Sequence, residues 1–313
     1  FITSLLLVHS IYSADTLSIK FNKNEVFEGK NKKYIQKLIS EIKKGENGNW
    51  SKAEFEKLLN RPEVSIVYTD ILVKYARPDS KKHQEGEADN YLKIFMREDR
   101  IRRGSKFISE NFIFLDKAEK KYGVLKKDIV SIMMWESGLG EFTGNYRIFN
   151  VFLNQILYLD VAEKYSVQHY FQKNGLSPYK SKVEETKAKK RLERIKANAV
   201  NSLVALLRES RKKNIDPLLQ LGSWGGAIGY IQFMPFNLKY VIDGDNNGTT
   251  DLYTYPDAIF SCANFLQTVG KYKSDVESRK KAIYRYNPSE NYVKGVVTYA
   301  DTIWNRYLTE GAK

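Results

Sequence analysis

The chain has 313 residues, of which 42% are hydrophobic, so it can bury the core of one large domain or two small ones. Its formal charge of +14 predicts attraction to an anionic partner, which could be nucleic acid, an anionic membrane face or a polyanionic carbohydrate wall. The single cysteine, Cys262, excludes an intramolecular disulfide and is expected on a buried helix face.

Motifs for two common classes of site are missing from the sequence. The three histidines lie far apart and in no metal-binding pattern, so a zinc site or a Ser-His-Asp triad has no support. There is no zinc-finger spacing, no Gly-rich phosphate loop and no basic and aromatic signature of nucleic-acid binding. No nucleic-acid partner is therefore expected.

A short apolar run opens the chain, "FITSLLLVHSIYSADT". It has the length of the hydrophobic segment of a secretory signal peptide and is too short to span a bilayer. Residues 1–14 are interpreted as a signal-peptide remnant, which predicts an exported protein of the periplasm or cell envelope. The alternative is a buried first strand or helix. No cysteine follows the run to carry a lipid anchor.

Helical periodicity dominates beyond residue 15. "NKKYIQKLISEIKKG" places Tyr34, Ile35 and Leu38 on one stripe. In the next segment, Ser51 is expected to cap a helix with Glu54 three residues later. Alternation of strands and helices is not seen, so a mainly α class is predicted.

One helix, "KKDIVSIMMWESGLG", carries an acid in an apolar setting. Asp128 is expected to cap its start, and Gly138 to end it. Glu136 then lies in the last turn, beside Met133 and Trp135, where desolvation and the negative end of the helix dipole favour its protonated form. The alternative is an ordinary helix-end acid with a hydrogen-bond partner.

A charge run, "KSKVEETKAKKRLERIK", spans residues 180–196 with eight bases and three acids. It leads into a stripe with Leu192, Ala199 and Leu203 at helical spacing. A solvated helix face is favoured here over a dedicated ligand-binding patch.

The stretch "LGSWGGAIGYIQFMPFN" is rich in glycine and then turns aromatic. Its backbone could approach a ligand closely, while Trp224, Tyr230 and Phe233 offer flat apolar faces of the kind that bind sugar rings. The glycines could equally serve tight packing, and the pattern alone leaves both interpretations open.

The loop "DGDNNGTTDLYTYPD" matches the first half of an EF-hand calcium loop. Asp243, Asp245 and Asn247 occupy positions 1, 3 and 5, Gly248 position 6, and the Thr249 carbonyl position 7. Position 12, however, is a threonine, and the next acid, Asp257, comes at position 15. A wider calcium loop closed by that acid is favoured over a solvated turn.

Near the C-terminus, "IYRYNPSENYVKGVVTYADTIWNRY" is expected to run from a tyrosine-rich loop into an amphipathic helix. Tyr286 and Asn287, placed in the loop, have polar tips that could orient a sugar or its acetamido group. Tyr292 and Tyr299 begin a helical stripe expected in the core.

Four ordered blocks, "MMWESGLG", "GSWGGAIGYIQFMP", "YPDAIFSCANFL" and "RYNPSENY", together resemble the membrane-bound lytic murein transglycosylase B family over about residues 50–307. The resemblance implies a lysozyme-like helical domain at 121–313 with an EF-hand-like loop, preceded by an N-terminal helical extension at 15–120. Residues 160–200 form a basic helical insert that is longer than usual for the family.

The resemblance also implies roles for individual residues. Glu136 matches the catalytic acid/base, and the closing acid of the family's structural calcium site likewise comes late. The expected calcium ligands are Asp243, Asp245, Asn247, Thr249 and Asp257. The expected substrate-binding residues are Ser223, Gln232, Tyr286, Asn287 and Tyr292, together with Tyr230 for its aromatic face.

The activity implied is cleavage of the β-1,4 bond between N-acetylmuramic acid and N-acetylglucosamine in peptidoglycan, leaving 1,6-anhydromuramyl ends. Ordinary glycosidases use two carboxylates, but nothing in the sequence fixes Glu141 opposite Glu136, so a substrate-assisted route is expected. A lysozyme-type hydrolase and a non-catalytic wall-binding protein are the alternatives. Peptidoglycan glycan strands are the expected partner, and the sequence specifies neither protein partners nor an oligomeric state.

Overall fold

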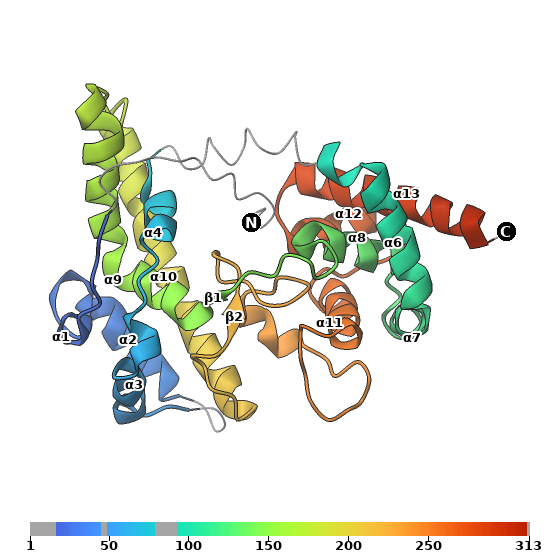
Figure 1. Ribbon diagram of the computed structural model, residues 1–313, viewed down its shortest axis with the longest axis horizontal. Helices are drawn as coiled ribbons and strands as arrows, with labels where there is room; N and C mark the ends of the chain where they lie inside the picture. The colour runs from blue at the N-terminus through green and yellow to red at the C-terminus, as the bar shows by residue number, and fades with distance from the viewer. Residues whose placement is uncertain (1–16, 45–48, 79–92, 312–313) are drawn as a thin grey trace.

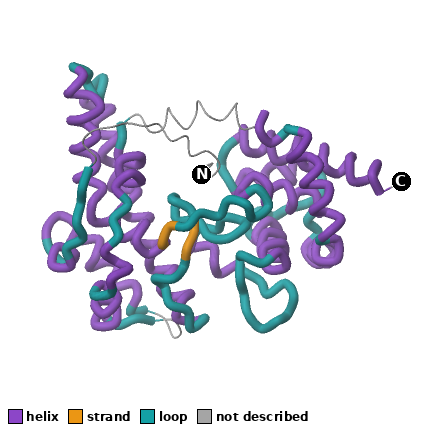
Figure 2. The backbone as a smooth tube through the Cα atoms, in the orientation of Figure 1, coloured by secondary structure: helices purple, strands orange, loops and turns teal. Residues whose placement is uncertain are grey.

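The computed structural model describes residues 17–44, 49–78 and 93–311. The interpretation of residues 1–14 as a signal-peptide remnant lies outside these residues and stays a prediction. Within them the chain is mainly helical, as the sequence predicts (Figure 2). Among the described helices, none is both long and apolar enough to cross a membrane.

The helices form two groups that lie side by side (Figure 1). The first group, at the left of the figure, consists of α1 (Lys23–Val26), α2 (Lys32–Ile42), α3 (Lys52–Leu59), α4 (Thr69–Ala76), α9 (Ile148–Ser166) and α10 (Lys182–Lys212). The second group consists of α6 (Glu98–Glu110), α7 (Phe112–Tyr122), α8 (Lys126–Ser137), α11 (Tyr255–Thr268), α12 (Val276–Tyr286) and α13 (Glu290–Gly311).

Short elements complete the two groups. A π-helical turn, Val167–Phe171, and three 3₁₀ turns, Gly29–Asn31, Pro62–Ser65 and Gln172–Asn174, belong to the first group, and a fourth 3₁₀ turn, Pro235–Tyr240, follows the glycine-rich block. Two strands, β1 (Tyr146–Arg147) and β2 (Leu221–Gly222), pair antiparallel at the centre of the molecule. Each strand lies in a segment that connects one group of helices to the other, so this pairing holds the two connecting segments together.

The packing does not follow sequence order. α9 packs against α4 and α10, and α10 packs against α2. In the second group α13 packs against α6 and α8, while α11 packs against α7. Residues 98–122 therefore pack with the C-terminal helices, and residues 148–212 with the N-terminal ones. The division of the chain at residue 120 stays a prediction.

Local signals in the sequence explain several helix ends. The predicted capping box is confirmed, because the Ser51 hydroxyl accepts from the Glu54 amide and the Glu54 carboxylate accepts from the Ser51 amide. Gly138 ends α8 with the left-handed conformation that glycine adopts without steric cost. The predicted cap at Asp128 is wrong. Its carboxylate is fully buried against Arg279, because a long-range ion pair outcompetes local capping.

The basic segment at residues 160–200 consists of the adjoining ends of α9 and α10 with the short turns between them. Most of its side chains up to Arg194 are exposed or partly exposed, as expected for a solvated helix face. Lys196 departs from this, because it is buried and pairs with Asp160 at 2.6 Å.

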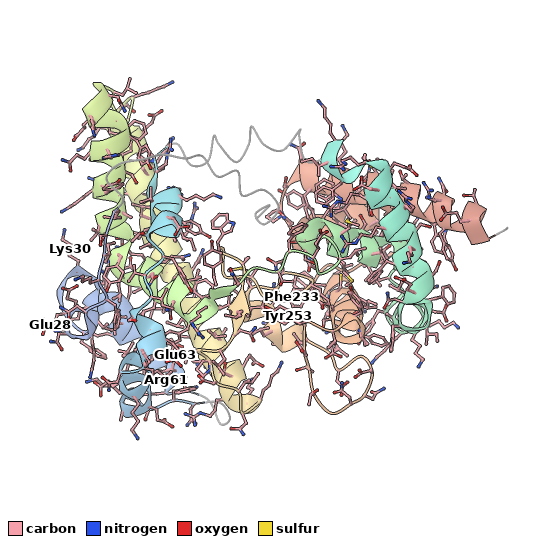
Figure 3. All side chains as sticks on the ribbon, viewed as in Figure 1. Glu28, Lys30, Arg61, Glu63, Phe233 and Tyr253 are labelled. Carbon is pink, nitrogen blue, oxygen red and sulfur yellow. The ribbon has the colours of Figure 1, made fainter. Side chains whose placement is uncertain are left out.

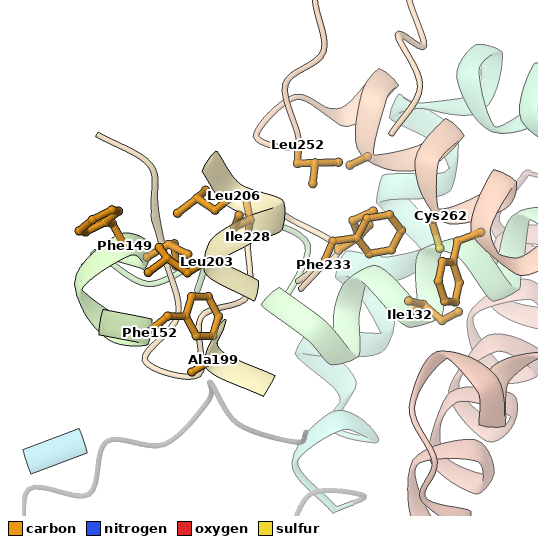
Figure 4. Packing of buried hydrophobic residues seen from close by; sticks show 14 of the residues in the cluster. Ile132, Phe149, Phe152, Ala199, Leu203, Leu206, Ile228, Phe233, Leu252 and Cys262 are labelled. Atoms are coloured by element: carbon orange, nitrogen blue, oxygen red, sulfur yellow. The ribbon is translucent and has the colours of Figure 1, made fainter. Parts of the chain in front are cut away.

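A continuous hydrophobic core links the two groups of helices (Figure 4). Phe149, Phe152 and Leu203 pack on the side of the first group, whereas Ile132 and Cys262 pack on the other side. The buried position predicted for Cys262 is confirmed, and burial raises the pKa of its thiol. This cysteine therefore behaves as a core residue.

Candidate active site

Glu136 lies in the last turn of α8, at the edge of a cavity, and its residue surface is 9% exposed. The residues before it, Ile132, Met133 and Met134, are fully buried. The apolar residues that pin α8 into the core thus also carry the carboxyl group into an environment with little water.

Burial raises the pKa of Glu136 from 4.5 to about 7, because desolvation penalises the charged form. The Tyr292 hydroxyl donates to Oε1 at 2.7 Å and acts in the opposite direction, since it stabilises the carboxylate. A group poised in this way exchanges a proton near neutral pH, as general acid-base chemistry requires.

Tyr292 reaches Glu136 because α13 lies unusually close to α8. A Cβ at Gly295 would lie 2.1 Å from a ring carbon of Trp135, so glycine is required at this point of α13. Trp135 in turn stacks on Phe95 at 4.2 Å and meets Tyr292 edge-on at 5.9 Å. The aromatic contacts thus hold the hydroxyl donor in place.

Replacing Tyr292 by phenylalanine is expected to move the pH dependence of any Glu136-dependent activity to higher pH. The lost hydrogen bond stabilises the carboxylate, and its removal raises the pKa further. A hydrogen bond to a charged group contributes about 1.5–3 kcal/mol, enough for a measurable shift in a pH–rate profile. Tyr299→Phe is the matched control, since Tyr299 lies on the same helix and donates to the Arg100 carbonyl instead. A shift of the Tyr292→Phe profile to lower pH would contradict this account.

The cavity beside Glu136 has a volume of about 550 Å³ and receives side chains from both groups of helices. Four of the predicted substrate-binding residues line this cavity together with Glu136: Ser223, Gln232, Tyr286 and Asn287. Tyr292 contacts Glu136 through its hydroxyl and is not among the described lining residues. Figure 3 labels Phe233, a further lining residue, near the centre of the molecule.

The glycine-rich block serves close packing and also contributes residues to the wall of the cavity. A Cβ at Gly226 would lie 2.3 Å from the Phe152 ring, so this glycine serves close packing. Gln232 has a left-handed φ of 48°, and its side-chain amide donates to the Gly229 carbonyl at 2.8 Å. Strained backbone of this kind is concentrated at functional sites. Ser223, which also lines the cavity, accepts from the Ala227 amide at 3.1 Å.

Tyr230 lies apart from the described lining of the cavity. Its ring covers Gly140 and packs against Tyr253 and Tyr255, with centroids 6.1 and 5.0 Å away. The contact between Tyr230 and a glycan stays a prediction.

Tyr286 is the last residue of α12, not a loop residue as expected from the sequence. The loop before α13 contains only residues 287–289, because helical hydrogen bonding continues up to the Asn287 amide. The Tyr286 hydroxyl donates to the Ile231 carbonyl. This bond fixes the end of α12 against the glycine-rich block.

Ser137, which the sequence analysis did not single out, joins Glu136 to the glycine-rich block. Its hydroxyl donates to the Tyr230 carbonyl at 2.6 Å and accepts from the Gly140 amide at 2.9 Å. The serine directly after the acid thus ties the end of α8 to the opposite part of the site. In the sequence, this role was indicated only by the position of Ser137 directly after an acid at a predicted helix end.

The predicted calcium loop brings three acids together. Asp243, Asp245 and Asp257 each place a carboxylate oxygen within 4.8 Å of the others, an arrangement that could hold a metal ion. Asp257 is buried at the start of α11 and accepts from the amides of Gly244 at 2.7 Å and Asp251 at 2.6 Å. The late acid therefore closes the loop.

The remaining loop residues adopt compatible geometry. Gly248, at position 6, has a φ of 86°, as the sharp EF-hand turn requires. Asn247 Oδ1 accepts from the amide of Thr249 at 2.9 Å. Burial, together with the charges of Asp245 and Asp243, raises the pKa of Asp257, so a cation would relieve this repulsion. The ligand roles of Asn247, Thr249 and the three acids stay predictions.

Several cavity residues were missed in the sequence. Gln155 on α9, with Asn198 and Ser202 on α10, forms part of the wall from the first group of helices. Arg285 on α12 and Lys239 in the turn Pro235–Tyr240, which packs against α10, supply positive charge. These residues carry no motif of their own, and only the packing of α9 and α10 brings them to the cavity.

Comparison with known families identifies the chain. The transglycosylase SLT domain model matches residues 30–275, which include every predicted site residue except Tyr286, Asn287 and Tyr292. The chain belongs to the transglycosylase SLT domain family. The mainly helical, lysozyme-like fold predicted from the sequence is confirmed.

Individual relatives of this transglycosylase SLT domain protein are distant. Membrane-bound lytic murein transglycosylase B of Escherichia coli (strain K12) is 29% identical over 186 residues, which are 59% of this chain and 42% of that protein. The chain thus spans less than half the length of this relative.

Solved structures share the fold of the transglycosylase SLT domain protein. Escherichia coli lytic transglycosylase Slt35 in complex with calcium has a TM-score of 0.62 and 19% identity, covering 89% of this chain and 93% of that one. Pseudomonas aeruginosa SltB3 in complex with NAG-anhNAM-pentapeptide has a TM-score of 0.56 and 17% identity, covering 87% and 78%.

Proposed function

We propose that the protein is a lytic transglycosylase that cleaves the β-1,4 bond between N-acetylmuramic acid and N-acetylglucosamine in peptidoglycan. The observation that carries the proposal is Glu136, a buried acid with a pKa of about 7 at the wall of a large cavity. Family membership supports the same substrate, as does the crystal structure of SltB3, in which the bound ligand is a peptidoglycan fragment.

The proposed reaction uses Glu136 twice. Its protonated form donates to the glycosidic oxygen as the bond to C1 breaks, while the muramyl acetamido oxygen stabilises C1. The resulting carboxylate then removes the proton from the C6 hydroxyl, whose oxygen bonds to C1. The product is a 1,6-anhydromuramyl end, Glu136 is protonated again, and no water is consumed.

The charges around the cavity support a single-carboxylate route. Glu136 is the one carboxylate among the described residues that line the cavity. Glu141, the nearest acid in sequence, pairs with Arg100 at 3.2 Å and with Arg103. An acid engaged in this way does not supply the second carboxylate that ordinary glycosidases place within about 5–9.5 Å of the first.

Mass analysis of the products released from isolated peptidoglycan tests this function. Anhydromuramyl ends are the expected result. Reducing ends would indicate a lysozyme-type hydrolase, and binding without release would indicate a wall-binding protein. Because peptidoglycan lies outside the cytoplasmic membrane, we also propose that the protein acts in the cell envelope.

We further propose that the loop at residues 243–257 binds calcium, with Asp243, Asp245, Asn247, the Thr249 carbonyl and Asp257 as ligands. The three clustered carboxylates support a hard divalent cation, and the related Slt35 fold was solved with calcium. The ion would brace the chain between the glycine-rich block and α11, a structural role remote from the chemistry.

Calcium is expected to raise the melting temperature of the protein, because an ion that binds only the folded state stabilises it by mass action. Differential scanning calorimetry with calcium and with a chelator measures the effect. Asp245→Asn is the informative variant, since Asp245 is exposed and its loss should abolish the calcium response with little change in the ion-free melt. An identical melting temperature with calcium and with chelator would contradict the proposal that the loop binds calcium.

A further inference from the structure

The wall of the cavity formed by α9 and α10 contains a neutral recess. Phe152 and Gln155 lie three residues apart on α9, and Asn198 and Ser202 lie four apart on α10, so each pair shares one helix face. All four line the cavity. They belong to the first group of helices, whereas Glu136 belongs to the second, and both groups contribute to the lining of the cavity; Figure 1 shows the two groups.

Ser202 is the informative member of this recess. Its residue surface is 1% exposed, and its hydroxyl finds no hydrogen-bond partner in the part of the chain that the structure describes. A buried hydroxyl without a partner lowers stability, so such a group in a native protein calls for an explanation. Since Ser202 also lines the cavity, a ligand that enters the recess can supply the missing partner.

The chemistry of the recess selects its occupant. Gln155, also buried, offers both an amide donor and a carbonyl acceptor, and Ser202 adds a hydroxyl. Ala199 and the Phe152 ring provide apolar surface beside them. None of the described residues from α9 and α10 that line the cavity is charged, so these two helices offer a ligand neutral hydrogen-bonding groups.

We propose that this recess binds the 2-acetamido group of an N-acetylated sugar that lies beyond the scissile bond. It would thereby select N-acetylated glycans over glycans that lack this group. An acetamido group is a short, neutral, terminal group with one donor, one acceptor and a methyl end, which matches the amide, hydroxyl and apolar surfaces of the recess. This inference rests on the proposed function for the identity of the glycan.

Equilibrium binding to two neutral β-1,4 oligosaccharides of equal length tests the inference without requiring cleavage. One is an N-acetylglucosamine oligomer, and the other is a glucose oligomer, which carries a hydroxyl in place of each acetamido group. Isothermal titration is performed on the full chain and on Ser202→Ala. Asn201→Ala is the matched control, because Asn201 is the exposed neighbour on the same helix and does not line the cavity.

Ser202→Ala is expected to weaken binding of the N-acetylglucosamine oligomer by roughly 3- to 10-fold, the effect of one lost hydrogen bond, and to leave binding of the glucose oligomer unchanged. The control should bind both ligands as the unmodified protein does. Equal losses for the two oligomers, or no loss for either, would overturn the inference.

Thermal melting of the ligand-free variant adds an independent check. Because the hydroxyl has no described partner, Ser202→Ala should melt at the same temperature as the unmodified protein or higher. A melting temperature lower by several degrees would show a structural role for the hydroxyl and overturn the inference. Both measurements are separate from product analysis, so the inference can fail while the protein still yields anhydromuramyl ends, and the reverse.

Discussion

Glu136→Gln is expected to reduce cleavage of peptidoglycan by roughly 10²- to 10⁴-fold, the usual contribution of general acid-base catalysis. The amide has the shape of the carboxyl group and its oxygen still accepts from the Tyr292 hydroxyl, but it transfers no proton. Glycan binding should therefore persist. Release of anhydromuramyl products from sacculi measures the loss, and Glu141→Gln, which removes an acid paired with Arg100 and Arg103 instead, is the matched control.

The same substitution should change how stability depends on pH. The pKa of Glu136 is raised on folding from 4.5 to about 7, so the folded state binds the extra proton in this window. Its favourable contribution is complete below pH 4.5 and is lost as the pH rises through 7. Above pH 7 the unmodified protein carries the cost of a buried charge, about 3 kcal/mol for a shift of this size, and glutamine does not.

Glu136→Gln should consequently melt higher than the unmodified protein above pH 7 and close to it near pH 4. Melting curves across this range test the electrostatic account apart from turnover. Near-normal cleavage by Glu136→Gln would contradict the catalytic assignment. Equal melting temperatures of the variant and the unmodified protein at all pH values would mean that the carboxylate is well solvated in the folded protein.

Features governed by short-range rules could be predicted from the sequence. The capping box at Ser51 and the helix end at Gly138 depend on residues within one turn, and both are confirmed. The burial of Glu136 follows from the apolar residues just before it in the same helix. The clustering of Asp257 with Asp243 and Asp245 could also be expected, because Asp257 is the next acid after position 12 of the loop.

Features set by long-range packing could not be predicted. Asp128 is a residue type that commonly caps helices, yet its carboxylate is buried in an ion pair with Arg279, 151 residues away. Tyr230 belongs to an aromatic, glycine-rich motif, and only the folded structure shows that its ring packs against Tyr255. Ser202 resembles any small polar residue of a helix until α9 and α10 are seen to form a cavity wall.

The Asp128–Arg279 pair connects the helices that carry the site. The guanidinium donates to both carboxylate oxygens, at 2.6 and 2.9 Å, and lies 3.3 Å from Asp301. Asp128 is on α8 with Glu136, Arg279 on α12 with Tyr286, and Asp301 on α13 with Tyr292. The hydrogen bonds to Asp128 raise the pKa of Arg279, so the guanidinium stays charged.

Arg279→Met is expected to lower the free energy of unfolding by about 3–5 kcal/mol, because it leaves the carboxylate of Asp128 buried without a counter-charge. Urea unfolding monitored by tryptophan fluorescence measures the change. Lys280→Met is the control, since Lys280 is the next residue on the same helix and half of its side chain is exposed, so its loss should cost little. A loss below 1 kcal/mol for Arg279→Met would mean that water or Lys127, which also reaches Asp301, compensates the buried charge. A loss in the expected range would instead show that the fold that holds Glu136 is stabilised by an ion pair near the opposite end of its helix.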